Sequence, residues 1–314
     1  MQGPDLKGAR LVALVNGLSG SMRGRDPDAF CASIVERFSA LGCDVRTVRI
    51  DRLGQPVEDI ARDAQADVLM AAGGDGTASA VAGVAHRTGA VFAVLPGGTM
   101  NLYSQTLGIP LDLDEAVEAL AGGDFAKADI AFANDRAFLN QYTLGFQPLA
   151  SKLRERMEYA SRWGKMWATA RCMGQVALTP PRFRVRLTLD GGEPRDYRLS
   201  NLSVSNNPLG EGHMPHADTF DGGRLGVYRT DPLTTRETFG LLADFVVGRW
   251  AQNEAVHVET AREVRIEMLS RPRSRRAAID GELVPLPKIT KIRIESGALS
   301  VLVPKRTLVE ERAA

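Results

Sequence analysis

Three glycine-rich segments hold the residues of this sequence that are best suited to bind phosphate. The densest is Gly73-Gly74-Asp75-Gly76-Thr77, which follows the apolar run Asp67–Ala72 and precedes a stretch with helical spacing. Glycines let the backbone approach a phosphate closely, and the first turn of a helix offers unpaired N–H groups and the positive end of its dipole. No Gly-Lys-Ser/Thr follows, so the segment is not a Walker A loop, and it lacks the spacing of the dinucleotide fingerprint.

Asp75 is the unusual member of this segment. A carboxylate beside a phosphate is repelled unless a cation lies between them, and Mg²⁺ is the oxygen-seeking ion suited to that place. The alternative is a tight strand-to-helix turn in which Asp75 only caps the helix. The residues alone leave both interpretations open.

The other two segments also end apolar runs. Pro96-Gly97-Gly98-Thr99-Met100-Asn101 follows Val91–Leu95, and Asn16-Gly17-Leu18-Ser19-Gly20 follows Arg10–Val15. In an open α/β sheet the carboxyl ends of the strands border one ligand-binding crevice. The three loops therefore predict a single phosphate-binding site.

The elements that position these loops alternate in type. Apolar runs and amphipathic helical stretches follow one another through residues 10–107, which indicates a Rossmann-like α/β domain with a parallel sheet covered on both faces. After about residue 125 the pattern changes to short alternating strands separated by turns, which indicates an antiparallel β-sandwich, with a helix over Thr235–Trp250. We expect domains at 1–130 and 131–314, with the last residues able to return to the first domain.

Composition narrows the class of protein. The chain has 314 residues with 39 Lys and Arg against 38 Asp and Glu, so no global basic field favours nucleic acid as a partner. No apolar stretch reaches the about 18 residues that a membrane-spanning helix needs, and no signal peptide is recognisable. Three cysteines without metal-ligand spacing indicate free thiols in a reducing cytoplasm.

His213 and His216 are interpreted as part of a polar loop, because two histidines without further ligands rarely hold a metal.

In this set and order, the motifs resemble the diacylglycerol kinase catalytic-domain family of bacterial lipid kinases, whose relatives include sphingosine and ceramide kinases. The Gly-Gly-Asp-Gly-Thr is intact at Gly73–Thr77, and Pro-x-Gly-Thr-x-Asn is represented at Pro96–Asn101, followed by Leu-Gly-Ile-Pro at Leu107–Pro110. The first loop lacks the proline of the family pattern but keeps Asn16, Ser19 and Gly20. Later stretches, among them Asp280-Gly281-Glu282, extend the resemblance from about residue 11 to 303.

The resemblance implies an ATP-dependent kinase for a lipid hydroxyl, such as that of diacylglycerol or a ceramide or sphingoid lipid, with ATP and Mg²⁺ as cofactors. By position it implies that the nucleotide is lined by Asn16, Ser19, Gly20, Thr47, Gly73, Gly74, Asp75, Gly76, Thr77, Gly98, Thr99 and Asn101. It also implies metal ligation by Asp75, and a second magnesium site formed by Asp221 with carbonyls of Asp218 and Gly223. Gly226 stands where the family often has Asp, which is a departure within that second site.

Glu282 is the residue that the resemblance implies as the catalytic base. It follows the apolar run Ala277–Ile279, so we expect a carboxylate buried near the lipid, where its affinity for the proton would suit a base. The alternative is a simple hairpin turn at Asp280-Gly281 that leaves Glu282 in solvent.

The expected partner is a lipid presented at a membrane surface, with a cytoplasmic protein bound peripherally to the inner face of the membrane; a homodimer is left open. Residues 151–171 carry a net charge of +4 and an apolar stripe with Trp163 and Trp167, which fits either a helix in a bilayer interface or a cap over the second core. The arginines between Arg271 and Arg276 form either a solvated loop or a site for anionic headgroups. Two other functions stay as alternatives: an NAD kinase-like enzyme, against which the pair Asn140-Gln141 argues, and a nucleotide-binding regulatory protein without chemistry.

Overall fold

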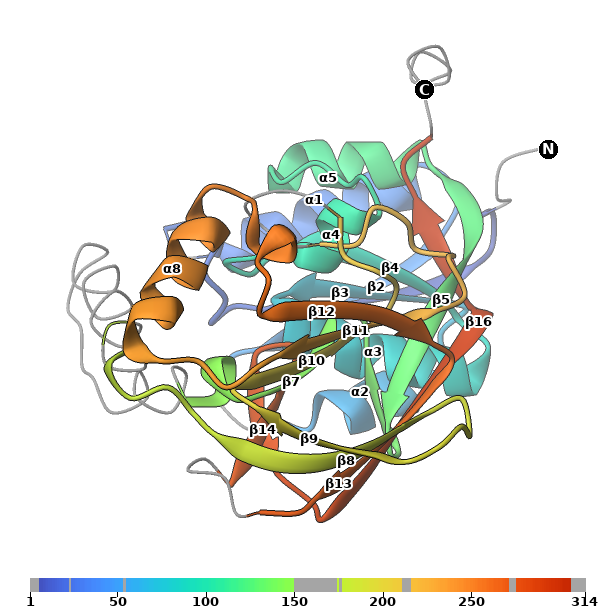
Figure 1. The fold of residues 1–314 in the computed structure, drawn as a ribbon. Coiled ribbons are helices and arrows are strands. Elements are labelled where there is room, and N and C mark those ends of the chain that lie inside the picture. The colour runs from blue at the N-terminus through green and yellow to red at the C-terminus, as the bar shows by residue number, and fades with distance from the viewer. Residues whose placement is uncertain are drawn as a thin grey trace, which may run out of the picture. The chain divides into compact units, whose positions relative to one another are not determined.

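The computed structural model divides the chain into two units, each built around its own β-structure (Figure 1). It describes residues 6–22, 24–52, 55–149, 174, 177–210, 216–270 and 275–305. The first unit comprises Met1–Ile130, Thr219–Asp221 and Glu295–Ala314, and the second comprises Ala131–Asp218 and Gly222–Ile294.

A parallel sheet forms the centre of the first unit. Its strands are β1 (Arg10–Asn16), β2 (Asp44–Ile50), β3 (Val68–Gly73) and β4 (Val91–Pro96), in the order β2-β1-β3-β4. Every residue of β3 is buried, as expected for a central strand with helices on both faces. The last part of β16 (Ile289–Val303) extends this sheet in parallel beside β4, where Val301 pairs with Phe92.

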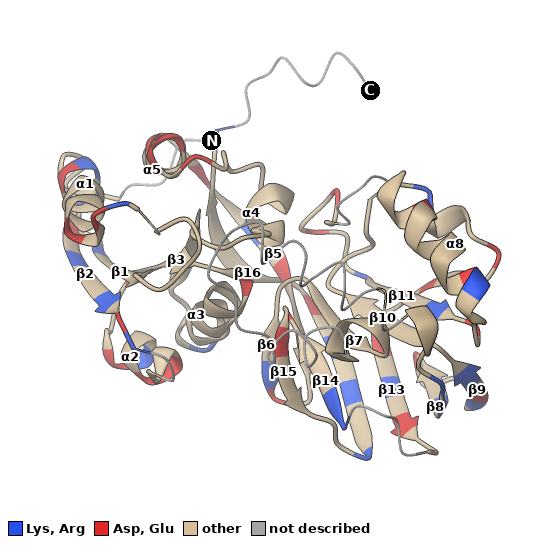
Figure 2. Cartoon of the chain, turned by 90° about the vertical axis from the view of Figure 1, so that its left-hand side faces the viewer, with Lys and Arg blue, Asp and Glu red and all other residues tan. Residues whose placement is uncertain are grey.

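The helices of the first unit begin at residues that the sequence marks. In α1 (Pro27–Ser39) the Asp26 side chain accepts a hydrogen bond from the Asp28 N–H, and Pro27 takes the first helical position. α3 (Asp75–Thr88) ends at Gly89, whose φ of 76° lies in the left-handed region. The remaining helices are α2 (Val57–Asp63), α4 (Leu102–Thr106) and α5 (Leu113–Ala121). Acidic and basic side chains are interspersed along α1 and α2 (Figure 2), in keeping with the near-zero net charge.

Three separate chain segments complete the first unit, and Asp129 joins them. This residue lies on β5 (Asp124–Ala133) and is fully buried. Its main-chain N–H donates to the Phe220 carbonyl at 2.7 Å, and its carboxylate accepts from the Gly297 N–H at 2.8 Å. The segment Thr219–Asp221 and the end of β16 are therefore held to β5 through one buried residue.

The second unit is an antiparallel sandwich. One of its sheets has the strand order β12-β11-β10-β7-β14-β15, and the other pairs the beginning of β16 with β13, β8 and β9. Val185 and Leu187 from one sheet and Val204 and Val227 from the other belong to a common core. The strands are β6 (Arg136–Phe138), β7 (Gln141–Leu144), β8 (Phe183–Leu189), β9 (Arg195–Leu199), β10 (Asn201–Ser205), β11 (Leu225–Thr230), β12 (Val256–Ala261), β13 (Glu263–Met268), β14 (Arg276–Ile279) and β15 (Glu282–Pro285).

The expected fold class, an α/β nucleotide-type domain with an antiparallel second domain, is confirmed. The expected helix over Thr235–Trp250 is α8 (Thr235–Val246), which begins with a capping box between Thr234 and Glu237, followed by the short 3₁₀ helix η1 (Trp250–Gln252). Among the described residues, no helix is both long enough and apolar enough to cross a membrane.

Candidate functional site

The glycine loops that follow β3 and β4 contact each other directly. The Gly97 N–H donates to the Gly73 carbonyl at 3.0 Å. A Cβ on Gly97 would lie 2.7 Å from the Gly73 Cα, and a Cβ on Gly98 would lie 2.6 Å from the Gly74 Cα. Two carbon atoms that are not bonded to each other cannot lie so close without displacing the main chain. The two loops therefore need glycine at these positions.

The loop after β1 joins the same cluster through two side chains. The Asn16 amide donates to the Thr77 hydroxyl at 3.3 Å. Ser21 donates its N–H to the Gly97 carbonyl at 3.0 Å, and its hydroxyl lies 3.0 Å from the Gly98 carbonyl. The structure therefore brings all three glycine-rich segments to one edge of the sheet. Ser21 was not among the predicted site residues, although its hydroxyl directly follows Gly20 in the sequence.

Ser19 and Asn101 differ in whether their side chains are already hydrogen-bonded within the loops. The Ser19 hydroxyl is buried and has no hydrogen-bond partner among the described residues. Asn101 has a φ of 51°, and its amide accepts from the Gly98 N–H at 2.7 Å and donates to the Pro96 carbonyl at 3.3 Å. Asn101 thus holds the loop in shape, whereas Ser19 has an unused donor within it.

Asp75 is the first residue of α3, with Gly74 as the preceding cap position. It is half-buried, and Gly76 and Thr77 complete the first turn. An acidic side chain in this turn is stabilised by the positive end of the helix dipole. Its carboxylate oxygens are also of the kind that Mg²⁺ prefers. The position of Asp75 thus fits both a magnesium ligand and a residue that only stabilises the start of the helix.

Thr47 lies apart from the loop residues. It occupies the middle of β2 opposite Ala13, near the Cys31 thiol of α1. Burial raises the pKa of that thiol, and the polar Thr47 side chain acts in the opposite direction. Thr47 therefore packs against a helix three positions before the strand ends, away from the edge that the other predicted residues share.

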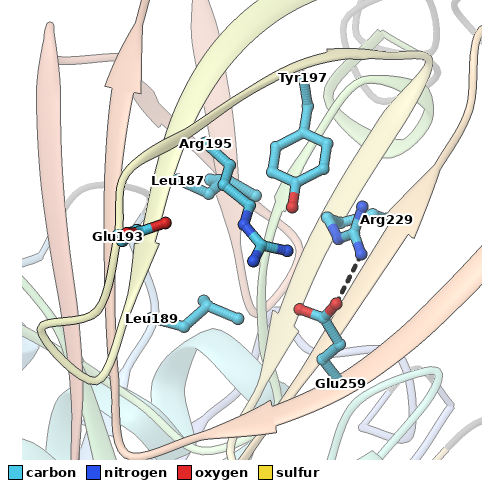
Figure 3. Close-up of a pocket in the computed structure, with 7 residues that line it drawn as sticks. All are labelled: Leu187, Leu189, Glu193, Arg195, Tyr197, Arg229 and Glu259. Atoms are coloured by element: carbon cyan, nitrogen blue, oxygen red, sulfur yellow. Dashed lines mark hydrogen bonds and ion pairs between the residues drawn. The ribbon is translucent and has the colours of Figure 1, made fainter.

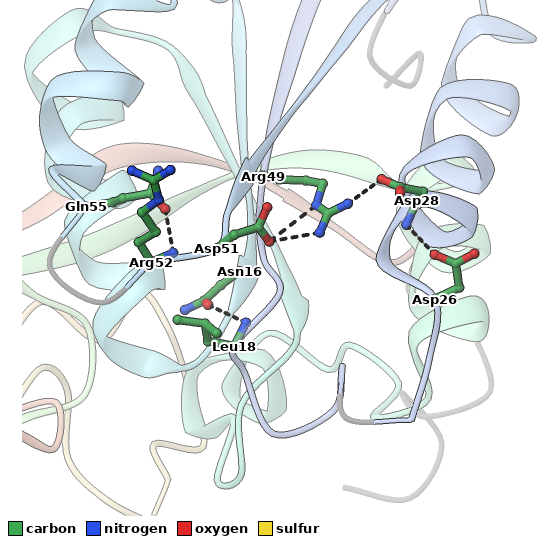
Figure 4. Close-up of polar contacts among 8 residues, drawn as sticks. All are labelled: Asn16, Leu18, Asp26, Asp28, Arg49, Asp51, Arg52 and Gln55. Atoms are coloured by element: carbon green, nitrogen blue, oxygen red, sulfur yellow. Dashed lines mark hydrogen bonds and ion pairs between the residues drawn. The ribbon is translucent and has the colours of Figure 1, made fainter.

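At the loop edge of β2 the structure has an ion network instead (Figure 4). Arg49 donates to Asp28 at 2.6 Å and to Asp51 at 3.1 Å. A Cβ on Gly17 would lie 2.7 Å from the Asp51 carboxylate, so Asp51 borders the first glycine loop. This network was not predicted, because it joins residues that are separated in sequence and lie on a helix and at the end of a strand.

The Asp280-Gly281-Glu282 segment forms the tight turn between β14 and β15. Asp280 and Gly281 both have positive φ, and Ile279 pairs with Glu282 across the hairpin. The buried Asp280 carboxylate accepts three main-chain N–H groups, from Leu139 at 2.8 Å and from the next two residues at 3.0 and 2.7 Å. This contact lies where the chain leaves β6 and enters β7, and it holds the residues that separate the two strands.

The expectation that Glu282 is buried is wrong. Its side chain is 54% exposed and forms an ion pair with Arg136. The two-residue turn ends directly before Glu282, so the apolar run that precedes the turn does not carry it into the core.

The remaining predicted metal ligands lie around residue 220. Asp218 and Asp221 are exposed, and the Asp218 carboxylate packs where a Cβ on Gly210 would be. In the described part of the chain, His, Cys, Asp and Glu side chains form no group of three or more that could hold a metal ion. Gly226 stands where the family often has Asp. A Cβ at this position would lie 2.6 Å from both the Tyr228 and the Ser205 hydroxyl oxygens, so the Tyr228 side chain lies in the space that a larger residue would need. Residues 151–171, His213, Arg271 and Arg273 lie outside the described residues.

Comparisons with known proteins match this architecture over most of its length. Residues 10–133 match the model of the diacylglycerol kinase catalytic domain, and residues 145–303 match that of the YegS C-terminal NAD kinase beta sandwich-like domain. A putative diacylglycerol kinase from Bacillus anthracis has the same fold, with a TM-score of 0.73, 21% identity and coverage of 95% of this chain and 96% of the other.

Curated relatives match over shorter segments. A putative lipid kinase of Staphylococcus epidermidis is 28% identical over 193 residues, which is 60% of each chain. A probable lipid kinase YegS-like of Cronobacter sakazakii is 33% identical over 132 residues, or 40% of this chain and 44% of the relative. The chain thus spans no more than 60% of the length of these relatives.

Fold and loops define a two-domain protein with an α/β domain of the diacylglycerol kinase catalytic type and a β-sandwich second domain. The chain belongs to the diacylglycerol kinase catalytic-domain family, with the YegS-type C-terminal domain.

Proposed function

We propose that this protein is an ATP-dependent kinase that phosphorylates the hydroxyl group of a lipid. The observation that carries the proposal is the glycine cluster at the edge of the parallel sheet, where three loops meet beside the first turn of α3. Main-chain N–H groups and a helix dipole at such a place favour the phosphates of a nucleotide. The buried, unpartnered Ser19 hydroxyl supplies one more donor for a phosphate oxygen.

Mg²⁺ fits the residues at this cluster. Asp75 brings carboxylate oxygens to the loop that would hold the phosphates, and the ion would neutralise phosphate charge during transfer. Asp75 would hold and orient the ion, while the glycines of β3 and β4 leave room for the phosphates. Replacement of Asp75 by Asn should abolish transfer while the fold survives, because the amide keeps the volume but loses the charge.

Glu282 is the proposed base that accepts the proton of the lipid hydroxyl. Its exposed carboxylate is available to a substrate, and Arg136 fixes its orientation through the ion pair. Glu282→Gln should lower turnover by roughly 10²–10⁴ with little change in stability. Glu263→Gln, which alters an exposed carboxylate of β13, is the matched control and should leave turnover unchanged.

The lipid-surface part of the proposal is supported by α8. Phe239, Leu242 and Val246 follow at i, i+3 and i+7 and share one face of this helix, and the first and last are 48% and 74% exposed. Apolar side chains exposed on one helix face favour contact with the interfacial region of a bilayer. We propose that the protein meets its substrate there, peripherally, at the inner face of the cytoplasmic membrane.

Vesicle sedimentation tests this contact. The double variant Phe239→Ser/Val246→Ser should lose binding to anionic vesicles, whereas Val258→Ser, which alters a valine of β12 as exposed as Phe239, should not. Equal binding by both variants would remove α8 as the membrane contact.

Phosphate transfer from labelled ATP to a panel of hydroxyl lipids in mixed micelles tests the whole proposal. The panel contains diacylglycerol, ceramide, a sphingoid base and a polyprenol, with NAD in a separate reaction. Label on a single lipid identifies the substrate, and Glu282→Gln must abolish that label. Label on NAD alone refutes the lipid kinase, and ATP binding without transfer to any acceptor favours a regulatory protein.

A further inference from the structure

A cavity of about 340 Å³ opens between the two sheets of the second unit, and the proposed function makes no use of it (Figure 3). It lies where the edge strands β9 and β12 end the two sheets. Leu187 and Leu189 form its apolar side. The other lining residues are charged or aromatic: Glu193, Arg195, Tyr197, Arg229 and Glu259.

Arg229 of β11 is fixed in this cavity by three features. It is only 9% exposed, its guanidinium lies 4.3 Å from the centre of the Tyr197 ring, and it donates to the Glu259 carboxylate at 2.7 Å. Its Nε is buried and has no hydrogen-bond partner among the described residues. A buried charged donor without an acceptor is unfavourable, so this atom points to an acceptor supplied from outside the chain.

Arg195 adds a second cation to the same cavity. It lies two positions before Tyr197 on β9, so both side chains are on the same face of the strand, and Figure 3 shows the Arg195 guanidinium and the Tyr197 hydroxyl directed into the cavity. The Arg195 side chain makes no hydrogen bond or ion pair with any residue that the structure describes. On the opposite face of the β8–β9 hairpin, whose basic residues appear in Figure 2, Arg186 pairs with Asp196 at 2.7 Å.

The cavity combines two guanidinium groups and a phenol hydroxyl with the carboxylates of Glu193 and Glu259. Glu259 is occupied by Arg229 and holds it in orientation, while Glu193 belongs to the exposed segment before β9. Two guanidinium groups and a phenol hydroxyl match the oxygens of a phosphate, and arginine binds phosphate through paired N–H groups. The apolar side formed by Leu187 and Leu189 lowers competition from water.

We propose that this cavity is a binding site for a phosphomonoester, contacted by Arg195, Arg229 and Tyr197. A phosphomonoester carries a charge of about −1.5 to −2 near neutral pH. The Arg195 cation attracts this charge, while Arg229, whose own charge is paired with Glu259, contributes its Nε–H as a donor. The volume exceeds that of a phosphate group alone, so a glycerol-sized body fits with it. The phosphate can come from a soluble phosphomonoester or from a lipid headgroup, and the two sources share this chemistry.

The proposal concerns residues of the second unit alone and does not depend on kinase activity. Binding is measured by calorimetry on the full chain, with a non-hydrolysable ATP analogue at saturation so that the glycine loops are filled. Glycerol 3-phosphate and inorganic phosphate are the soluble probes. Cosedimentation with phosphatidylcholine vesicles, with and without phosphatidate, tests the lipid source.

Arg195→Gln removes an exposed side chain without a partner, so the fold should persist while phosphomonoester binding weakens about tenfold or more. Arg229→Lys keeps a cation for Glu259 but loses the Nε donor, and the same weakening is expected. Arg186→Gln is the matched control on the other face of the hairpin and should bind as the wild type does. A soluble source is indicated by binding of glycerol 3-phosphate, and a lipid source by binding of phosphatidate vesicles alone.

Two results would overturn the proposal. One is the absence of binding by the wild type to every soluble probe and of any preference for phosphatidate vesicles. The other is unchanged binding in Arg195→Gln, which would assign the observed phosphate to another part of the chain. If Arg229→Lys does not fold, Arg195→Gln and Arg186→Gln still decide between these outcomes.

Discussion

The contact between the two glycine loops predicts unequal effects of alanine at two facing positions. A Cβ on Gly98 would lie 2.6 Å from the Gly74 Cα and 2.9 Å from the Asn101 side-chain oxygen. A Cβ on Gly74 would meet the Gly98 Cα at 3.5 Å, an ordinary van der Waals distance. Gly98→Ala must therefore push the loops apart, whereas Gly74→Ala does not.

The sizes of the two effects follow from these distances. Carbon atoms in contact normally lie about 3.5–4.0 Å apart, so Gly98→Ala creates an overlap of about 1 Å against main chain that cannot rotate away. Overpacking of this kind costs about 1–3 kcal/mol. Gly74→Ala should change the free energy of unfolding by less than about 0.5 kcal/mol. If the loops hold phosphates, both variants lose ATP affinity, Gly98→Ala by misplacing N–H groups and Gly74→Ala by filling space with its methyl group.

Thiol labelling measures this difference in the first unit. Cys31 and Cys43 are buried there, whereas the three tryptophans fall within the residue ranges of the second unit and would not report on it. With Cys172 replaced by Ser, the labelling rate in increasing urea gives the stability of the first unit, and equilibrium dialysis gives the ATP affinity. Wild-type stability in Gly98→Ala, or equal destabilisation by Gly74→Ala, would refute the loop contact described above.

Three further predictions concern other contacts. Ser21→Ala removes the hydroxyl that bonds the β4 loop and should weaken ATP binding by about twofold to tenfold, measured by dialysis, whereas Ser33→Ala, which alters a hydroxyl within α1, should not. Asp280→Asn should destabilise the second unit by about 2–3 kcal/mol in urea, followed by tryptophan fluorescence, because the amide cannot accept all three N–H groups; an unchanged midpoint would contradict this role. The hydrogen-bonded Arg25 guanidinium holds the pKa of Asp114 below its usual value, so this pair stabilises the fold above about pH 3.9 and the benefit is lost as the pH falls through the lowered pKa. Asp114→Asn should therefore cost up to about 1 kcal/mol near pH 7, since solvent screens the pair, and nothing once the carboxyl is protonated; urea unfolding at several pH values gives the difference.

The sequence was sufficient to predict the strands and helices of residues 10–107, because their signals are local. The caps at Asp26 and Gly89 and the buried run of β3 each specify an element within a few residues. The strand ends that carry glycine follow from those elements, so the convergence of the three loops could be predicted.

Contacts between distant segments could not be predicted in this way. The strand β16 runs without interruption from Ile289 to Val303, although Gly297 within it has a φ of 60°. It pairs first with β13 and then with β4, which lies far earlier in the sequence. Thr47 was implied by its position in the family pattern, and only the packing of α1 on β2 places it near Cys31 instead. Burial of Glu282 depended on how a turn ends, which the apolar run before it does not determine.

The junction at Asp129 has a consequence for how the chain is made. The sheet that carries the glycine loops gains the end of β16 beside β4 only after the entire second unit has been synthesised. During translation of the second unit, one edge of β4 therefore remains unpaired. Asp129 of β5 likewise cannot form its hydrogen bonds with Phe220 and Gly297 until those segments have left the ribosome. Completion of the nucleotide-type sheet is thus a late event of synthesis, although its loops are among the first residues translated.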